Sequence, residues 1–132
     1  MNKDHTTEFI AAETTQIISA FWSGNAEDYT QYYADDISFT DEYGNGSGLK
    51  RMTELMSERT AGRSFVIDGM QMNVTVNNGI YILTGKYNIC ENQKIIKTYR
   101  MYAVWLNNNG LKLAVLDFLL RADSMDFRIN VY

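Results

Sequence analysis

The stretch from Gly24 to Gly44, GNAEDYTQYYADDISFTDEYG, decides the fold class of this chain. It predicts a short amphipathic helix that runs directly into a β-strand. Side chains along a strand alternate between its two faces, so Asp41 is expected on the same face as Ile37 and Phe39. A carboxylate that faces an apolar interior is costly unless it has a partner or a task. Asp41 is therefore the first candidate functional residue.

Helices are predicted on both sides of this strand. The first covers about residues 6–23, where apolar side chains recur at helical spacing, and Gly24 is a favoured residue just after a helix end. Asn25 is a suitable cap for the short second helix. After a glycine-rich loop, apolar residues at helical spacing predict a third helix from about Leu49 to Arg59.

The rest of the chain predicts a sheet. Four long strands follow one another, joined by Asn-Gly and other Asn-containing turns. They are expected at residues 64–77, 80–91, 94–106 and 111–121. The alternation changes parity at Asp68 and Gly69, which is typical of a β-bulge. The predicted class is α+β, with three N-terminal helices packed on a strongly curved, mainly antiparallel sheet.

Composition limits the classes of function. The chain has 132 residues, of which 45% are hydrophobic and 21% charged, as expected for one globular domain. Its net charge of −4 argues against nucleic-acid binding by this segment. No apolar stretch is long enough to cross a membrane, and the N-terminal residues lack the apolar core of a signal peptide. Cys90 is the single cysteine, so a cytoplasmic location is expected.

The same counts argue against bound metals. One histidine and one cysteine cannot build a zinc site. The glycine-rich loop at residues 44–48 lacks the Lys-Ser/Thr ending of a phosphate-binding loop. We therefore expect no metal and no cofactor.

A homodimer is expected from the last predicted strand, which is apolar on both faces. Leu113, Val115 and Leu119 share one parity, and the other parity carries Ala114, Leu116, Phe118 and Leu120. A strand with two apolar faces is buried on both sides, and the helices can cover only one. The outer face of the sheet is then expected to meet a second copy of the chain.

The tail has its own pattern. We expect one domain at residues 1–122 and a C-terminal extension at residues 123–132. The run Phe127–Tyr132 alternates like a strand. It is either a further strand at the sheet edge or the start of another domain, since chain ends are normally loosely held.

The order of these elements resembles the nuclear-transport-factor-like superfamily, which includes ketosteroid isomerases and SnoaL-like polyketide cyclases. The resemblance covers about residues 8–121. Its most specific part is Tyr33-Ala34-Asp35-Asp36-Ile37-Ser38-Phe39-Thr40-Asp41, followed by Gly44. The resemblance implies a cone-shaped α+β barrel with a pocket between the sheet and the helices. It also places Asp41 where ketosteroid isomerases carry their general base.

Two departures from that family pattern concern the oxyanion hole, which in the isomerases combines a tyrosine with a protonated aspartic acid. Ile17 occupies the tyrosine position and can donate no hydrogen bond. Tyr102 lies near the position of the acid. Because the loss of one oxyanion-hole donor typically lowers the rate by about 100- to 1,000-fold, steroid isomerisation itself is not expected.

Each candidate catalytic residue has a structural alternative. Asp41 is a general base whose pKa a dry pocket would raise, or a turn-forming residue that binds the following loop. Tyr102 stabilises an enolate, or is an aromatic core residue. Asp117 is a second acid or a proton relay, or it pairs with Arg100 on the neighbouring strand, or it lies at a dimer interface.

Two functions from different classes follow. In the first, the chain is a binding or sensory module that holds a small apolar molecule in the cone. The residues expected to line this pocket are Ile17, Phe21, Tyr33, Phe39, Met56 and Trp105. In the second, it is an isomerase- or cyclase-like enzyme in which Asp41 removes a proton next to a carbonyl. Because Ile17 removes one expected donor, the binding module is favoured.

Overall fold

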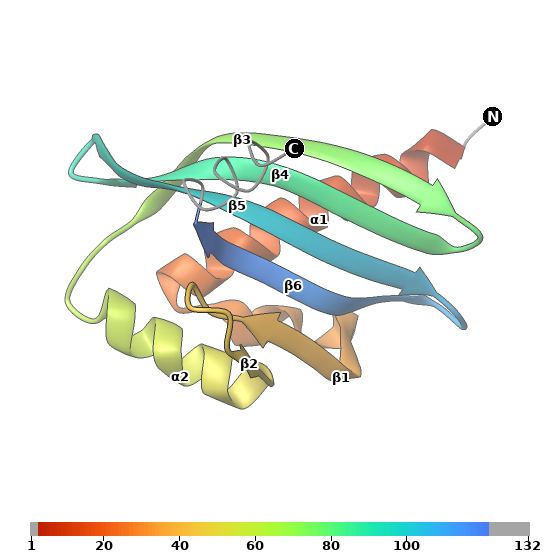
Figure 1. Ribbon diagram of the computed structural model, residues 1–132, viewed down its shortest axis with the longest axis horizontal. Helices are drawn as coiled ribbons and strands as arrows, with labels where there is room; N and C mark the ends of the chain where they lie inside the picture. Colours follow the sequence, from red (N-terminus) through yellow and green to blue (C-terminus); the bar gives the residue numbers. More distant parts are fainter. Residues whose placement is uncertain (1–2, 122–132) are drawn as a thin grey trace, which may run out of the picture.

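The computed structural model describes residues 3–121 and shows a long helix behind a six-stranded sheet (Figure 1). The helices are α1 (Lys3–Ser23), the 3-10 helix η1 (Ala26–Tyr32) and α2 (Leu49–Thr60). The strands are β1 (Tyr33–Thr40), β2 (Gly46–Ser47), β3 (Val66–Asn77), β4 (Ile80–Glu91), β5 (Lys94–Asn107) and β6 (Leu111–Arg121). None of the helices within the described part is long and apolar enough to span a membrane.

The sheet has the order β2-β1-β6-β5-β4-β3. All neighbouring strands are antiparallel except β1 and β6, which are parallel. The predicted α+β class and mainly antiparallel sheet are thereby confirmed. The predicted strong curvature stays a prediction, and the expected extension at residues 123–132 lies outside the described residues.

The predicted bulge in β3 is confirmed. The pairing of β3 with β4 shifts register between Asp68 and Gln71, and Gly69 has a φ of +65°. Glycine adopts this left-handed conformation without a steric penalty. The bulge explains why the apolar parity of β3 changes at this point.

Two further irregularities, which the sequence analysis did not predict, separate β5 from β6. The register shifts between Arg100 and Tyr102 and again between Val104 and Trp105. The apolar residues of β6 can therefore lie on the inner face despite their different parities. Leu113, Leu116, Phe118 and Leu119 are all fully buried in one core cluster. The apolar residues of β6 thus do not require a second copy of the chain to cover the outer face. The outer-face dimer stays a prediction, and the apolar pattern of β6 no longer supports it.

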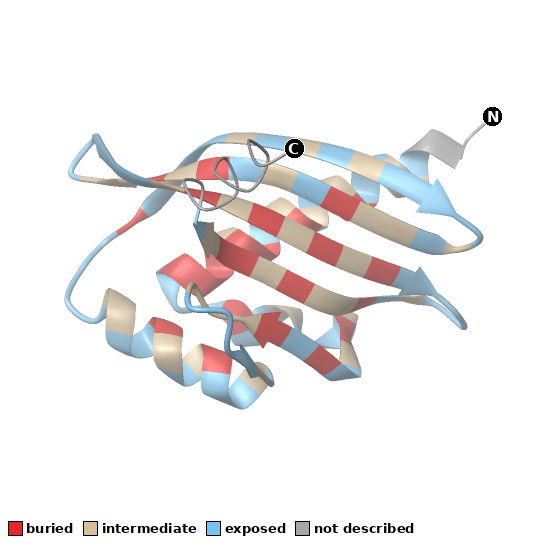
Figure 2. Cartoon of the chain, viewed as in Figure 1, coloured by how far each residue is buried: buried red, intermediate tan, exposed pale blue. Residues whose placement is uncertain are grey.

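The core lies between α1 and the inner face of the sheet, and buried positions alternate regularly along β5 (Figure 2). The Trp105 indole N–H donates to Thr14 Oγ1 at 2.9 Å, and that hydroxyl donates to the Ile10 carbonyl at 2.7 Å. The Trp22 indole N–H donates to the Tyr87 hydroxyl at 3.3 Å. These bonds join α1 to β4 and β5.

Gly85 allows β3 and β4 to approach closely. A Cβ atom at this position would lie 1.9 Å from the Gln71 carbonyl oxygen, which belongs to the backbone and cannot move aside alone. We expect Gly85→Ala to lower the free energy of unfolding by about 2–3 kcal/mol through overpacking. Gly46→Ala, whose Cβ would meet its nearest atom at 3.8 Å, should change it by less than about 0.5 kcal/mol. Urea denaturation measures both, and equal effects would contradict this explanation.

Candidate functional site

The six residues expected to line an apolar pocket are core residues. Ile17, Phe21, Tyr33, Phe39, Met56 and Trp105 are between 0% and 6% exposed and belong to one buried cluster. The Phe21 ring packs edge-on against Phe39 with ring centres 5.3 Å apart. Phe21 and Met56 also border a hollow of about 280 Å³ between the end of α1 and α2. The six predicted residues therefore lie together, as expected. Their side chains pack on one another in the core and do not line a common pocket.

Asp41 lies just after β1 and binds the loop that follows. Its Oδ1 accepts hydrogen bonds from the backbone N–H groups of Tyr43 and Asn45, both at 2.9 Å. Its own N–H donates to the Asn45 carbonyl at 3.0 Å. This is the geometry of the turn-forming alternative.

The pKa of Asp41 is shifted opposite to the direction expected for a general base in a dry pocket. Desolvation raises it and is the largest single influence, but the hydrogen bonds from Asn45 and Tyr43 and the charge of Arg59 together outweigh it and hold the pKa below its ordinary value. Of the two alternatives left open for Asp41, this lowered pKa favours the turn-forming one. The Asp41 carboxylate is stabilised in its charged form, and it accepts hydrogen bonds from two backbone N–H groups.

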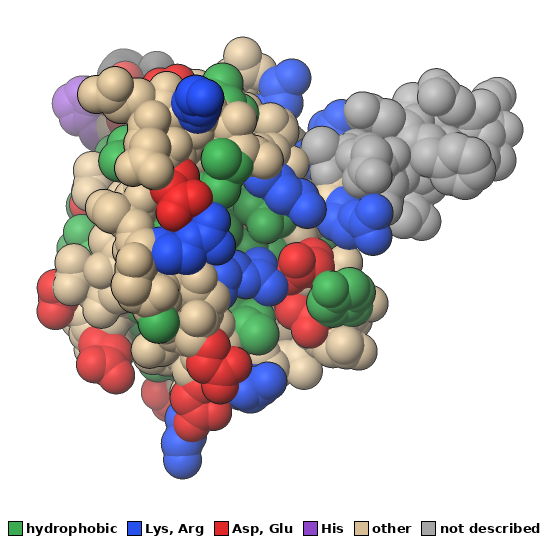
Figure 3. Space-filling model, turned by 90° about the vertical axis from the view of Figure 1, so that its left-hand side faces the viewer, with side chains coloured by type: hydrophobic (Ala, Val, Ile, Leu, Met, Phe, Trp, Pro, Cys, Tyr) green, Lys and Arg blue, Asp and Glu red, His purple; other side chains and the backbone are tan. Residues whose placement is uncertain are grey.

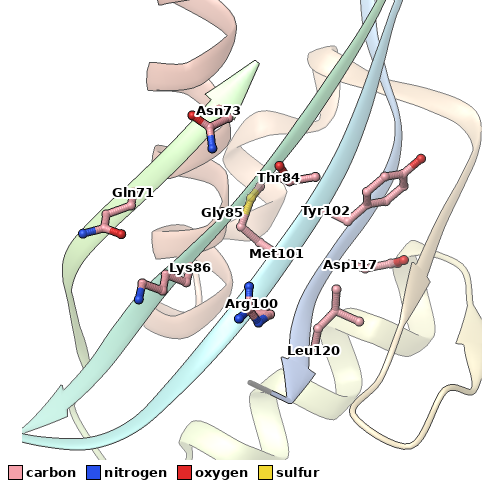
Figure 4. Close-up of a pocket in the computed structure, with 10 residues that line it drawn as sticks. All are labelled: Gln71, Asn73, Thr84, Gly85, Lys86, Arg100, Met101, Tyr102, Asp117 and Leu120. Atoms are coloured by element: carbon pink, nitrogen blue, oxygen red, sulfur yellow. The ribbon is translucent and has the colours of Figure 1, made fainter. Parts of the chain in front are cut away.

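A hollow of about 380 Å³ lies on the outer face of the sheet, away from α1 (Figure 4). Thr84, Tyr102 and Asp117 stand directly opposite one another across β4, β5 and β6. Lys86 and Arg100 form the next cross-strand pair. The full lining is Gln71, Asn73, Thr84, Gly85, Lys86, Arg100, Met101, Tyr102, Asp117 and Leu120. The hollow therefore unites Tyr102 and Asp117, while Asp41 is not among its lining residues.

The two sides of this hollow differ in charge. Lys86 and Gln71 lie on its β3 side, with Arg100 near its centre, and Asp117 lies towards β1 (Figure 4). Within residues 3–121, no salt bridge joins Lys86 to an acid. The side of the hollow nearest β3 is consequently suited to a negatively charged group.

Asp117 is partly buried at the β1 side of the hollow. Burial raises the pKa of this carboxyl above its ordinary value, although hydrogen bonds from the side chain and backbone of Thr40 act in the opposite direction. Its Oδ1 is buried and has no hydrogen-bond partner among the described residues. The expected salt bridge to Arg100 is not among the ion pairs of those residues.

The polar residues on β3 and β4 were missed by sequence reasoning. Thr84 and Lys86 share one parity of β4, as Gln71 and Asn73 do on β3, so an outward-facing polar set was predictable. Their meeting with Arg100 and Tyr102 depends on the strand register, which the sequence pattern did not reveal. In the described part of the chain, no three His, Cys, Asp or Glu side chains gather as metal ligands would.

The end of the molecule that carries the β4–β5 turn has mixed charge. Basic and acidic side chains are interspersed there, with hydrophobic side chains between them (Figure 3). Arg63 and Glu91 form a salt bridge at 2.6 Å in this region. This end of the molecule therefore presents no continuous basic surface of the kind that nucleic-acid backbones attract.

Asp41 should contribute to stability through its loop bonds. We expect Asp41→Ala to lower the free energy of unfolding by about 1 kcal/mol, because two backbone donors lose an acceptor at an exposed site. Asp41→Asn keeps a side-chain oxygen that can accept in the same turn, so most of the stability should remain. Equal losses in urea denaturation for both variants would contradict the turn-forming role.

Asp117 should make stability depend on pH in the opposite sense to Asp41. Because its pKa is raised in the folded chain, its favourable contribution is complete below the ordinary value of 3.8 and is lost as pH rises through the raised pKa. Asp117→Asn should therefore gain in melting temperature relative to the native chain as the pH rises from about 3 to about 7. A constant difference between the two chains across this range would contradict the shift.

Comparison with known proteins identifies the fold. No protein-family model and no curated protein matches the sequence. A proposed dehydratase of the NTF2-like family from Streptomyces avermitilis matches with a TM-score of 0.68 at 15% identity, over 87% of this chain and 95% of that one. A proposed ketosteroid isomerase from Shewanella frigidimarina matches with a TM-score of 0.61 at 16% identity, over 79% and 89%.

A third solved structure agrees with these two. An NTF2-like protein from Cytophaga hutchinsonii matches with a TM-score of 0.64 at 13% identity, over 91% of this chain and 99% of that one. At such identities the likeness shows the fold and leaves the activity open. The resemblance predicted from the sequence is confirmed at that level: the chain has the NTF2-like, ketosteroid isomerase-like fold.

Proposed function

We propose that this chain is a binding module for a small organic anion, held in the hollow on the outer face of the sheet. The observation that carries the proposal is the cross-strand pair of Lys86 and Arg100 in the lining of a hollow of about 380 Å³. Ligand sites commonly have volumes of about 300–1,000 Å³. The packing of the predicted interior pocket is why we place the ligand outside the core.

The lining suggests how such a ligand would bind. A carboxylate or phosphate group would accept hydrogen bonds from Lys86 and Arg100, which are the usual partners of these anions. Gln71 and Asn73 offer amide donors on the adjacent strand, and Leu120 offers apolar contact. The ligand class therefore differs from the apolar molecule expected from the sequence.

The enzymatic alternative receives less support. It needs Asp41 and Tyr102 to converge on one cavity, with the Asp41 carboxylate available to take a proton. Asp41 instead accepts the N–H groups of Tyr43 and Asn45, and the lining of the hollow contains Tyr102 without Asp41. The likeness to a proposed isomerase and a proposed dehydratase extends to the fold, so we propose binding without acid–base chemistry at Asp41.

Lys86→Ala tests this proposal. With a panel of small carboxylates and phosphate esters, calorimetry should identify at least one ligand whose affinity the variant lowers about tenfold, since a charge-assisted hydrogen bond contributes about 1.5 kcal/mol. Lys94→Ala removes the same charge at the β4–β5 turn, outside the hollow, and should leave the affinity within about twofold. Equal losses in both variants, or no binding by the native chain to any member of the panel, would contradict the proposal.

A further inference from the structure

The strand β3 (Val66–Asn77) forms one edge of the sheet. It pairs with β4 along one side only, and no other described strand follows it in the sheet order. Figure 1 shows it at the border of the sheet, opposite the border formed by β1 and β2. At 12 residues it is long for an edge strand, and strands average about 5–6 residues. An edge of this length presents a row of backbone groups to which another strand can bind.

The composition of this edge lacks the usual protection. From Met70 to Val76 the strand reads MQMNVTV, with no charged residue and no proline. Natural edge strands are commonly kept from pairing by lysine, proline or short length. The bulge occupies Gly69 and Met70, and from Gln71 onward the run pairs regularly with β4. The segment from 70 to 76 is therefore an uncharged edge to which another strand can be added.

The two faces of the run also suit self-association. On its inner face, Met70, Met72 and Val74 are only partly buried against the core, and Val76 is 50% exposed. The residues of the other face, Gln71, Asn73 and Thr75, are exposed and polar. A strand added beside β3 would cover more of the apolar side chains, and polar groups would meet on the other face.

We infer that β3 pairs in antiparallel orientation with β3 of a second copy of this chain, centred on Asn73, so that the two sheets become continuous. This register aligns the whole run from 70 to 76 with itself. It places Met72 opposite Val74 and Met70 opposite Val76 on the inner face, and Gln71 opposite Thr75 on the outer face. No like charges face one another in this arrangement, which is the condition for favourable cross-strand pairs. The inference does not depend on the proposed ligand.

Disulfide trapping tests the register. In a Cys90→Ser background, Asn73→Cys should form an intermolecular disulfide under mild oxidation, because directly opposed Cα atoms in an antiparallel pair are about 4.5–5.5 Å apart. Thr75→Cys is the matched control. Its two copies would lie four residues apart along the strands, about 13 Å, which no disulfide can bridge. Cross-linking at position 75 in place of position 73 would overturn the inference.

Mass measurement by light scattering tests the surface itself. The native chain should be a dimer at micromolar concentration, and Asn73→Lys should make it a monomer by placing two like charges at the centre of the pairing. Val104→Lys, on the outer face of β5, should leave the dimer intact while circular dichroism confirms that both variants are folded. A monomeric native chain, or a dimer that only Val104→Lys disrupts, would overturn the inference, the latter in favour of the outer face.

Discussion

The attachment of α1 to the sheet rests on aromatic residues whose polar atoms bond to one another inside the core. The Trp105 indole, the Thr14 hydroxyl and the Ile10 carbonyl form a continuous chain of hydrogen bonds. The Tyr87 hydroxyl accepts from the Trp22 indole and donates to the Phe118 carbonyl. A buried polar atom is costly when it is unpaired, so these bonds specify one position of α1 over the strands. They allow bulky aromatic side chains to fill the interior without unpaired polar groups.

This filled interior determines where chemistry can occur. Trp105 and Phe118 are fully buried, and they occupy space between α1 and the sheet. The concentrated polar side chains lie instead on the outer face, where Lys86, Arg100 and Tyr102 project from β4 and β5. A fold shared with proposed isomerases and dehydratases therefore does not by itself place a reactive cavity in this chain.

Local sequence signals predicted the helices, strands and turns well. The site was predicted less well, because it depends on which residues of distant strands stand opposite one another. The turns at Asn78-Gly79 and Asn92-Gln93 allowed β4 to be predicted with the bounds that the structure shows, since these residues adopt positive φ. Asp41 was misplaced because strand alternation was extended one residue beyond Thr40, where β1 ends and a turn begins. At that junction the capacity of aspartate to bind the next N–H groups prevailed over the alternation.

The irregularities between β5 and β6 show why parity alone could not locate the exposed face. Each register shift reverses the relation between position in the sequence and face of the sheet, and no glycine marks either shift on β6. Leu119 is therefore fully buried although its parity opposes that of Phe118. The same shifts bring Asp117 opposite Tyr102. The hollow is lined by residues of four strands, and the strand registers determine which of them meet. From the sequence, these residues could be identified as outward-facing, but it could not be predicted that they are neighbours.

The proposed ligand site and the proposed pairing edge share residues, which has a thermodynamic consequence. Gln71 and Asn73 line the hollow and also lie at the centre of the exposed run of β3. A second strand beside β3 would extend the wall of the hollow on the side where Lys86 lies. If it raises the affinity for an anion, linkage requires that the anion strengthen self-association by the same factor. Anion binding in the hollow and self-association of the chain would then be thermodynamically coupled through the side chains at positions 71 and 73.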